Sequence, residues 1–170
     1  MQFATLYLEM ERNAALIRSL VMGFTPDEAR LKPSPETWSV LKVVGHLCDE
    51  ERHDFRVHLG NILHARLPIT APGTAMLPYN ERDLTDAIED FVAERIRSLA
   101  WLKELGSPDW ETSAVLSFGP ANEQYTFKAG DMMTSWVAHD NLHLRQLVEL
   151  QRVKIVHMAE PYSVEYAGKW

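Results

Sequence analysis

The spacing of the apolar residues constrains this fold more than any other feature of the sequence. In four long segments, apolar side chains recur at intervals of three and four residues, the period of an α-helix with one buried face. These segments cover residues 3–22, 39–64, 80–106 and 126–152. Connections that contain Pro and Gly separate them. The sequence therefore predicts a single all-α domain over residues 1–170, built on four helices.

Residues with capping side chains stand where the helices are expected to begin. Ser39 and Thr126 each precede an apolar repeat, and their hydroxyl oxygens can accept hydrogen bonds from free backbone N–H groups at a helix start. Asn80, followed by Asp83 three residues later, indicates the start of the third helix. Gly23 marks the expected end of the first helix.

The segments between the helices differ in length and character. Residues 65–79 form the longest irregular connection, which is long enough to carry the chain across a bundle. Residues 114–118 and 124–127 are short apolar pieces that predict a small hairpin. Residues 153–156 are a β-like run that opens a short C-terminal tail. The aromatic side chains of this tail are expected to dock on the bundle or on a partner chain.

Composition and charge narrow the classes of function. A formal net charge of -7 without a cluster of Lys and Arg argues against nucleic acid as a partner. We expect no membrane association, because the sequence shows no signal peptide, no membrane-spanning run and no basic amphipathic helix. The single cysteine, Cys48, excludes an internal disulfide and falls at a core position of the second helix. Such cysteine usage predicts a cytoplasmic location.

Two histidines in the fourth helix carry the strongest functional signal. His139 and His143 are four residues apart, so on a helix they lie on one face, one turn from each other. Trp136 and Leu147 share that face, which places both imidazoles within the apolar stripe. Buried imidazoles need partners, and two at this spacing can share a metal ion. The alternative is a pair of hydrogen-bonded histidines without a metal.

The second and third helices each contribute further polar candidates. The second carries a strip with His46, Glu50 and His53, but its apolar residues occupy roughly the opposite side, so periodicity does not place His46 toward the core. Glu50 is a helical neighbour of both histidines, which suits either a partner of a metal ligand or a solvated salt bridge. Arg95 falls within the apolar stripe of the third helix. It is expected either to bind an anionic group of a substrate or to pair with an acidic side chain.

Two stretches together resemble the DinB-like (YfiT/DinB) superfamily. Residues 38–47 read WSVLKVVGHL, and residues 139–147 read HDNLHLRQL. They match a family pattern of a Trp-Ser helix opening with a histidine eight residues after the Trp, and of His-x3-His followed by Gln. The resemblance implies a four-helix bundle with long crossover connections and a short C-terminal tail, commonly a homodimer. It also implies a divalent metal, Zn, Ni or Fe, held by His46, His139 and His143.

The family also sets the expectations for function. Relatives include enzymes that join low-molecular-weight thiols to electrophiles, a thiol-dependent isomerase, and proteins described as metal-dependent hydrolases. The resemblance therefore implies first a metal-dependent thiol S-transferase, whose small-molecule substrate would be a low-molecular-weight thiol, and as the alternative a metal-dependent hydrolase. Glu50 is the candidate proton acceptor, and Arg95 or residues 65–79 are the candidate substrate contacts.

A third interpretation is a non-catalytic, stress-associated bundle whose metal is structural. An enclosed fourth ligand would favour it, and His53, seven residues after His46, is the candidate. Asp140 lies between the two histidines of the fourth helix. It is expected either to orient a ligand imidazole or to form a hydrogen bond at the helix surface.

Overall fold

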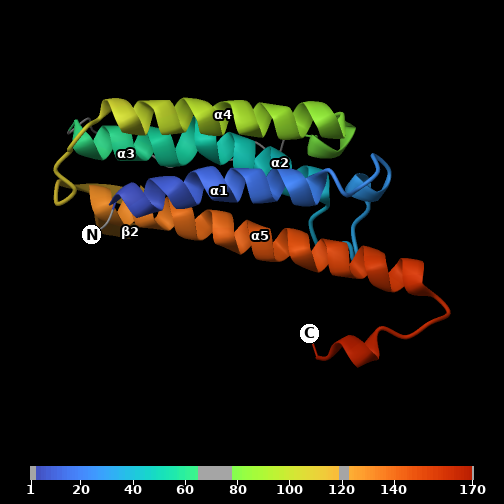
Figure 1. The fold of residues 1–170 in the computed structure, drawn as a ribbon. Coiled ribbons are helices and arrows are strands. Elements are labelled where there is room, and N and C mark those ends of the chain that lie inside the picture. The colour runs from blue at the N-terminus through green and yellow to red at the C-terminus, as the bar shows by residue number, and fades with distance from the viewer. Residues whose placement is uncertain (1–2, 65–77, 119–122, 170) are drawn as a thin grey trace.

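Four helical rods form the body of the protein (Figure 1), which confirms the predicted four-helix bundle. The computed structural model describes residues 3–64, 78–118 and 123–169. One rod is divided into two α-helices joined by the π-helical turn η2, which spans Glu50–Asp54. The α-helices of the rods are α1 (Phe3–Val21), α2 (Val40–Asp49), α3 (Phe55–Leu63), α4 (Leu84–Glu104) and α5 (Ala129–Ala159).

The order of the helices in space differs from a simple up-and-down bundle. Helix α1 packs against α4 and α5, and the rod formed by α2 and α3 also packs against α4 and α5. In Figure 1, α1 and α5 run in one direction, whereas α2, α3 and α4 run in the other. The end of α3 and the start of α4 therefore lie at opposite ends of the bundle, as the long crossover connections implied by the resemblance require. Most of the predicted 65–79 connection, residues 65–77, lies outside the described residues.

The predicted cap of the second helix is confirmed, whereas α4 is capped by Asp83 and not by Asn80, which lies in the 3-10 turn Tyr79–Glu81. The Ser39 hydroxyl accepts a hydrogen bond from the backbone N–H of Lys42, at 3.1 Å, at the start of α2. The carboxylate of Asp83 accepts from the backbone N–H groups of Thr85 and Asp86 at the start of α4. Each side chain satisfies N–H groups that have no partner within the helix.

The predicted hairpin is present, but both predicted ends of the last helix are wrong. Strands β1 (Ser113–Phe118) and β2 (Glu123–Lys128) pair antiparallel, and Thr126 lies in β2 rather than at a helix start. Helix α5 begins three residues later, where the Asp131 carboxylate accepts from the backbone N–H of Lys128 at 3.0 Å. It also continues through residues 153–156, because the helix propensity of β-branched residues is lower than that of Ala by only about 0.5 kcal/mol each.

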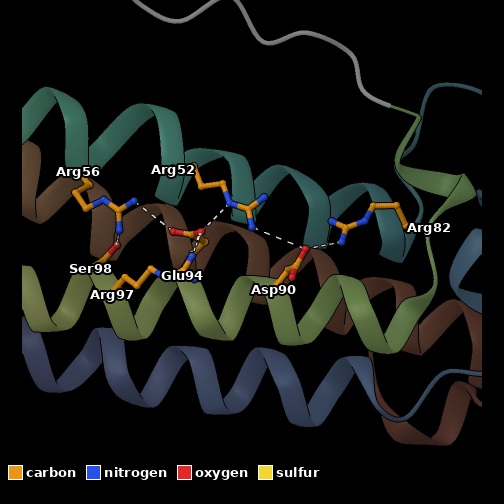
Figure 2. Close-up of polar contacts among 7 residues, drawn as sticks. All are labelled: Arg52, Arg56, Arg82, Asp90, Glu94, Arg97 and Ser98. Atoms are coloured by element: carbon orange, nitrogen blue, oxygen red, sulfur yellow. Dashed lines mark hydrogen bonds and ion pairs between the residues drawn. The ribbon is translucent and has the colours of Figure 1, made fainter.

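A polar seam joins α4 to the rod of α2 and α3 (Figure 2). The Glu94 carboxylate, whose side chain is 5% exposed, accepts from Arg52 Nε at 2.8 Å and from Arg56 Nη2 at 3.3 Å. One turn earlier on α4, Asp90 lies 3.8 Å from Arg52 and accepts from Arg82, just before the helix, at 2.6 Å. Because the pairs with Arg52 and Arg56 bridge the two rods, they help to hold α4 in place beside η2. No helix among the described residues has the length and apolar character needed to cross a membrane.

Cys48 lies in the core, as the sequence predicted, and its thiol is expected to be inert. It is 1% exposed, and burial raises the pKa of its thiol to about 11. Since the thiolate is the reactive form, native protein should react with a disulfide reagent at mildly alkaline pH far more slowly than protein in denaturant. Absorbance of the released thiol measures both rates. Rapid stoichiometric reaction of the native chain would contradict this assignment.

Candidate metal centre

The structure brings together the three histidines that the sequence and the resemblance singled out. His46 on α2 faces His139 and His143 on α5, and one nitrogen of each lies within 4.8 Å of the others. The Nε2 atom of His139 is 3.2 Å from Nε2 of His46 and 3.1 Å from Nε2 of His143. Three ring nitrogens from two helices therefore converge on one point.

Hydrogen bonding alone does not account for this convergence. A neutral imidazole carries either one N–H or one lone pair at Nε2, so His139 can form a normal hydrogen bond with only one of its two neighbours. A tetrahedral ion with ligand bonds of about 2.0–2.1 Å places its ligand nitrogens roughly 3.3–3.4 Å apart. The observed separations of 3.2 and 3.1 Å are close to that spacing. The donor set thus fits a divalent metal that accepts imidazole.

The outward nitrogens of two of these rings face oxygen acceptors. His143 Nδ1 lies 2.9 Å from Oε1 of Gln146, one turn further along α5. His46 Nδ1 lies 3.5 Å from Oε1 of Glu50. An Nδ1–H that points at an oxygen leaves the Nε2 lone pair free for the centre, which is how the partners of metal-bound histidines fix ring orientation and tautomer.

Burial keeps the three rings neutral in the absence of metal. Desolvation, together with the neighbouring histidines, lowers the pKa of His46 to about 4. Desolvation and His143 lower the pKa of His139 to about 4, and desolvation also lowers the pKa of His143. Neutral imidazole is the form that binds metal, so near neutral pH protons do not compete for these nitrogens.

These shifts predict how the stability of the metal-free protein depends on pH. From the ordinary histidine value of 6.5 down to about 4, the unfolded chain binds protons that the folded His46 and His139 do not. Stability should therefore fall as pH falls through that window. Glu50 acts in the opposite direction, because burial, Asp54 and Asp49 raise its pKa to about 7.

Urea unfolding of chelator-treated protein at several pH values measures this dependence. The Glu50→Gln variant should lose stability more steeply on acidification, since the opposing group is gone. A His46→Asn/His139→Asn double variant should show a flatter profile. Stability that rises with acid over the same window, in wild-type protein, would show that the rings are not held neutral.

Aromatic side chains and an open groove surround the centre. The Trp38 ring stacks on His143 with centroids 5.9 Å apart and meets His46 edge-on at 5.0 Å. Phe55 lies against His139 at 5.2 Å. An open groove of about 740 Å³ reaches one of the three histidines; its lining is Trp38, Leu142, His143, Arg145, Gln146, Val148 and Glu149. The groove therefore gives a small molecule access to His143 from the α5 side.

Trp38 and Gln146 stand within the two family motifs, but neither they nor Phe55 had a predicted role in the site. Gln146 could have been inferred from its spacing, because residues three apart on a helix are neighbours. Trp38 lies before the start of α2, where helical periodicity makes no prediction. Phe55 follows η2, so its position depends on a turn that no spacing in the sequence revealed.

The structure also decides the place of His53. His53, the candidate for a fourth ligand, is exposed and lies outside the histidine group, so it does not complete the site. In the parts of the chain that the structure describes, no other His, Cys, Asp or Glu joins the three histidines. The cause is η2, where the backbone N–H of Phe55 bonds to the carbonyl of Glu50, five residues back. A helical wheel drawn with about 3.6 residues per turn therefore no longer gives the direction of the side chains after this turn.

Glu50 remains a candidate, but its contact is with a ligand rather than with the centre. It faces the outer nitrogen of His46, so the geometry gives it an orienting position, and its role as proton acceptor stays a prediction. His58, eight residues after Glu50, is 2% exposed, and its Nδ1 lies 3.1 Å from Oδ1 of Asp54.

Of the two expectations for Arg95, the structure supports the pairing with acidic side chains. Its side chain is 1% exposed and pairs with Glu51 and Asp140, which leaves it no free face for a substrate. Nε and Nη2 donate to Glu51 Oε1, Nη1 and Nη2 donate to the two oxygens of Asp140, and Nη1 also donates to the Met10 carbonyl. These bonds occupy all five N–H donors of a guanidinium group. Asp140 is accordingly in the core, not at the helix surface.

Fold and site together define a class: a four-helix bundle with a three-histidine candidate metal centre between two of its helices. The sequence profile of the DinB superfamily matches residues 9–147. The chain belongs to the DinB superfamily.

One solved structure illustrates the relation. YfiT from Bacillus subtilis, described as a probable metal-dependent hydrolase with an unusual four-helix bundle topology, superimposes with a TM-score of 0.71 at 17% sequence identity. The match covers 90% of this chain and 87% of that one. At this identity the likeness establishes the shared fold. None of the curated proteins matches this chain in sequence.

Proposed function

We propose that this protein is a metal-dependent enzyme that transfers a low-molecular-weight thiol to an electrophile, with Zn, Ni or Fe held by His46, His139 and His143. One observation carries the proposal: three neutral imidazoles converge on one point, and one of them, His143, lines an open groove. Three protein ligands leave a coordination position for a substrate, as in catalytic rather than structural sites. A divalent ion bound there supplies a Lewis acid that favours the thiolate form of a bound thiol at neutral pH.

The residues around the centre have complementary tasks in this proposal. Gln146 and Glu50 hold the imidazoles of His143 and His46 in orientation. The groove walls, Trp38 and Leu142, cover the apolar part of the substrates and keep water away from the reacting sulfur. Arg145 on the same groove offers a cation to an anionic group of the thiol.

The test is a direct assay with protein loaded with each metal in turn. A panel of low-molecular-weight thiols is incubated with generic electrophiles, and consumption of thiol is compared between wild-type protein and His143→Ala. We expect a metal-dependent rate that the variant loses. Equal rates for the two proteins across the panel would refute the transferase proposal.

A metal-dependent hydrolase is the second candidate, supported by the description of YfiT. The same centre would then activate water, and Glu50, whose pKa burial raises to about 7, would be its candidate proton acceptor. Cleavage of ester or amide probes without added thiol, lost in His143→Ala, would favour this candidate. Cleavage that survives in the variant would exclude it.

We also propose that the protein is a homodimer. The last turns of α5 and the segment after it leave several large apolar side chains exposed among the described residues: Ile155, Met158, Tyr162 and Tyr166. In Figure 1 this segment leaves the bundle and turns back alongside α5. A second copy is the partner that would cover it. Sedimentation at several concentrations tests this, and a strictly monomeric protein would refute it.

A further inference from the structure

A buried charged network connects the two helices that carry the histidines. Glu51 lies on η2, five residues after His46, and Asp140 lies on α5 between His139 and His143. Glu51 is 1% and Asp140 is 0% exposed. Because one histidine is on one rod and two are on another, the shape of the centre depends on how these rods are placed relative to each other.

Arg95, from a third helix, contacts both acids at once. Its Nη2 atom lies 2.6 Å from Glu51 Oε1 and 2.7 Å from Asp140 Oδ1, and its Nη1 atom lies 2.7 Å from Asp140 Oδ2. The contact with Asp140 is a two-pronged pair of a planar guanidinium and a carboxylate, which fixes orientation as well as distance. A single planar guanidinium group thus sets the spacing between η2 and α5.

Further contacts hold the same two acids from other directions. Trp136 on α5 donates from Nε1 to Glu51 Oε1 at 2.7 Å, and so ties α5 directly to η2. Asn13 on α1 contacts Asp140 Oδ2 at 3.4 Å. The network therefore touches all four rods of the bundle, at the level where the histidine-bearing helices face each other.

Stability alone is a poor reason for burying these charges. Desolvation of buried ion pairs is expensive, and well-packed apolar residues of similar volume are often at least as stabilising. Unlike apolar packing, the charged network fixes the positions of the two histidine-bearing rods relative to each other. The π-helical turn that presents Glu51 inward supports this, since such turns cost regular hydrogen bonding and are frequent at functional sites.

We propose that Arg95 is a positioning residue for the metal centre, which clamps Glu51 and Asp140 and thereby holds His46 in register with His139 and His143. The inference rests on the proposed metal site but not on the reaction it performs. The charges of Glu51, Arg95 and Asp140 set the geometry of metal binding rather than the stability of the bundle.

The test uses Co²⁺ alone as the probe, because its visible absorption reports coordination geometry. Two variants change the clamp: Arg95→Lys, which removes the planar fork, and the uncharged triple variant Glu51→Gln/Arg95→Met/Asp140→Leu. The Glu51→Gln change keeps a side-chain oxygen that can accept from Trp136. A matched control is Leu102→Ala, which opens a cavity on the same helix, away from the network.

We expect both clamp variants to fold and to bind Co²⁺ about tenfold to a hundredfold more weakly, with an altered visible spectrum. Leu102→Ala should melt at a lower temperature but keep the wild-type affinity and spectrum. A folded clamp variant with wild-type Co²⁺ affinity and spectrum would refute the positioning role of Arg95. A triple variant that fails to fold would also refute it, and so would a Leu102→Ala protein that loses as much Co²⁺ affinity as the clamp variants. Failure of wild-type protein to take up Co²⁺ would overturn the metal site itself.

Discussion

Replacing His46, His139 or His143 by Ala is expected to weaken metal binding by at least about a hundredfold. Structural zinc sites with four ligands bind with about 10–16 kcal/mol, or roughly 2.5–4 kcal/mol per ligand, and about 1.4 kcal/mol is a factor of ten. The centre offers only three protein ligands among the described residues, so each substitution leaves only two ligands to hold the ion. Untagged wild-type protein, purified without chelator, should carry about one divalent ion per chain, and each variant should carry almost none.

Elemental analysis of the purified proteins measures this, and chelator competition gives the affinities. His53→Ala is the matched control, because His53 is exposed on the same rod as His46 but outside the histidine group. It should retain the metal. Metal lost from His53→Ala, or wild-type protein that takes up no ion from a panel of divalent metals, would contradict the three-histidine assignment.

Replacing Arg95 by Met is expected to lower the free energy of unfolding of the metal-free protein by about 3–5 kcal/mol. The substitution leaves the carboxylates of Glu51 and Asp140 buried without their shared counterion. Burial alone would lower the pKa of Arg95, but its bonds to Asp140 and the charge of Glu51 raise it, so the guanidinium is charged and its loss uncompensated. Urea unfolding followed by far-ultraviolet circular dichroism measures the change.

Arg97→Met provides a matched control on the same helix. Arg97 lies two residues after Arg95 and pairs with Glu94, but its side chain is 64% exposed (Figure 2). Glu94 keeps Arg52 and Arg56 as partners when Arg97 is replaced, and the pair of an exposed arginine contributes about 0–1 kcal/mol, so this variant should be nearly as stable as the wild type. A similar decrease in the free energy of unfolding for the two variants would show that burial does not determine how much the Arg95 ion pairs stabilise the protein.

The helices and the histidine pair could be predicted because both depend on local spacing. His139 and His143 share a face of any regular helix, whatever surrounds it. The position of His46 opposite them depended on the family pattern, since the apolar periodicity of its own helix pointed elsewhere. The end of α5 was harder to predict, because residues 153–156 include β-branched side chains and yet continue the helix. Single-residue helix propensity predicts the end of a helix poorly, because extending an existing helix by one turn costs little free energy.

The sequence by itself determined the helical rods, the cap at Ser39 and the residue types of the centre, because each follows from contacts within a few residues. Only the tertiary structure decided that Arg95 binds acids and that His53 faces solvent. The pairing of Arg95 joins residues 44 and 45 positions apart in the chain, and no local pattern encodes such a contact. The place of His53 follows from one π-helical turn, which packing between rods stabilises and which shifts every later side chain around the helix.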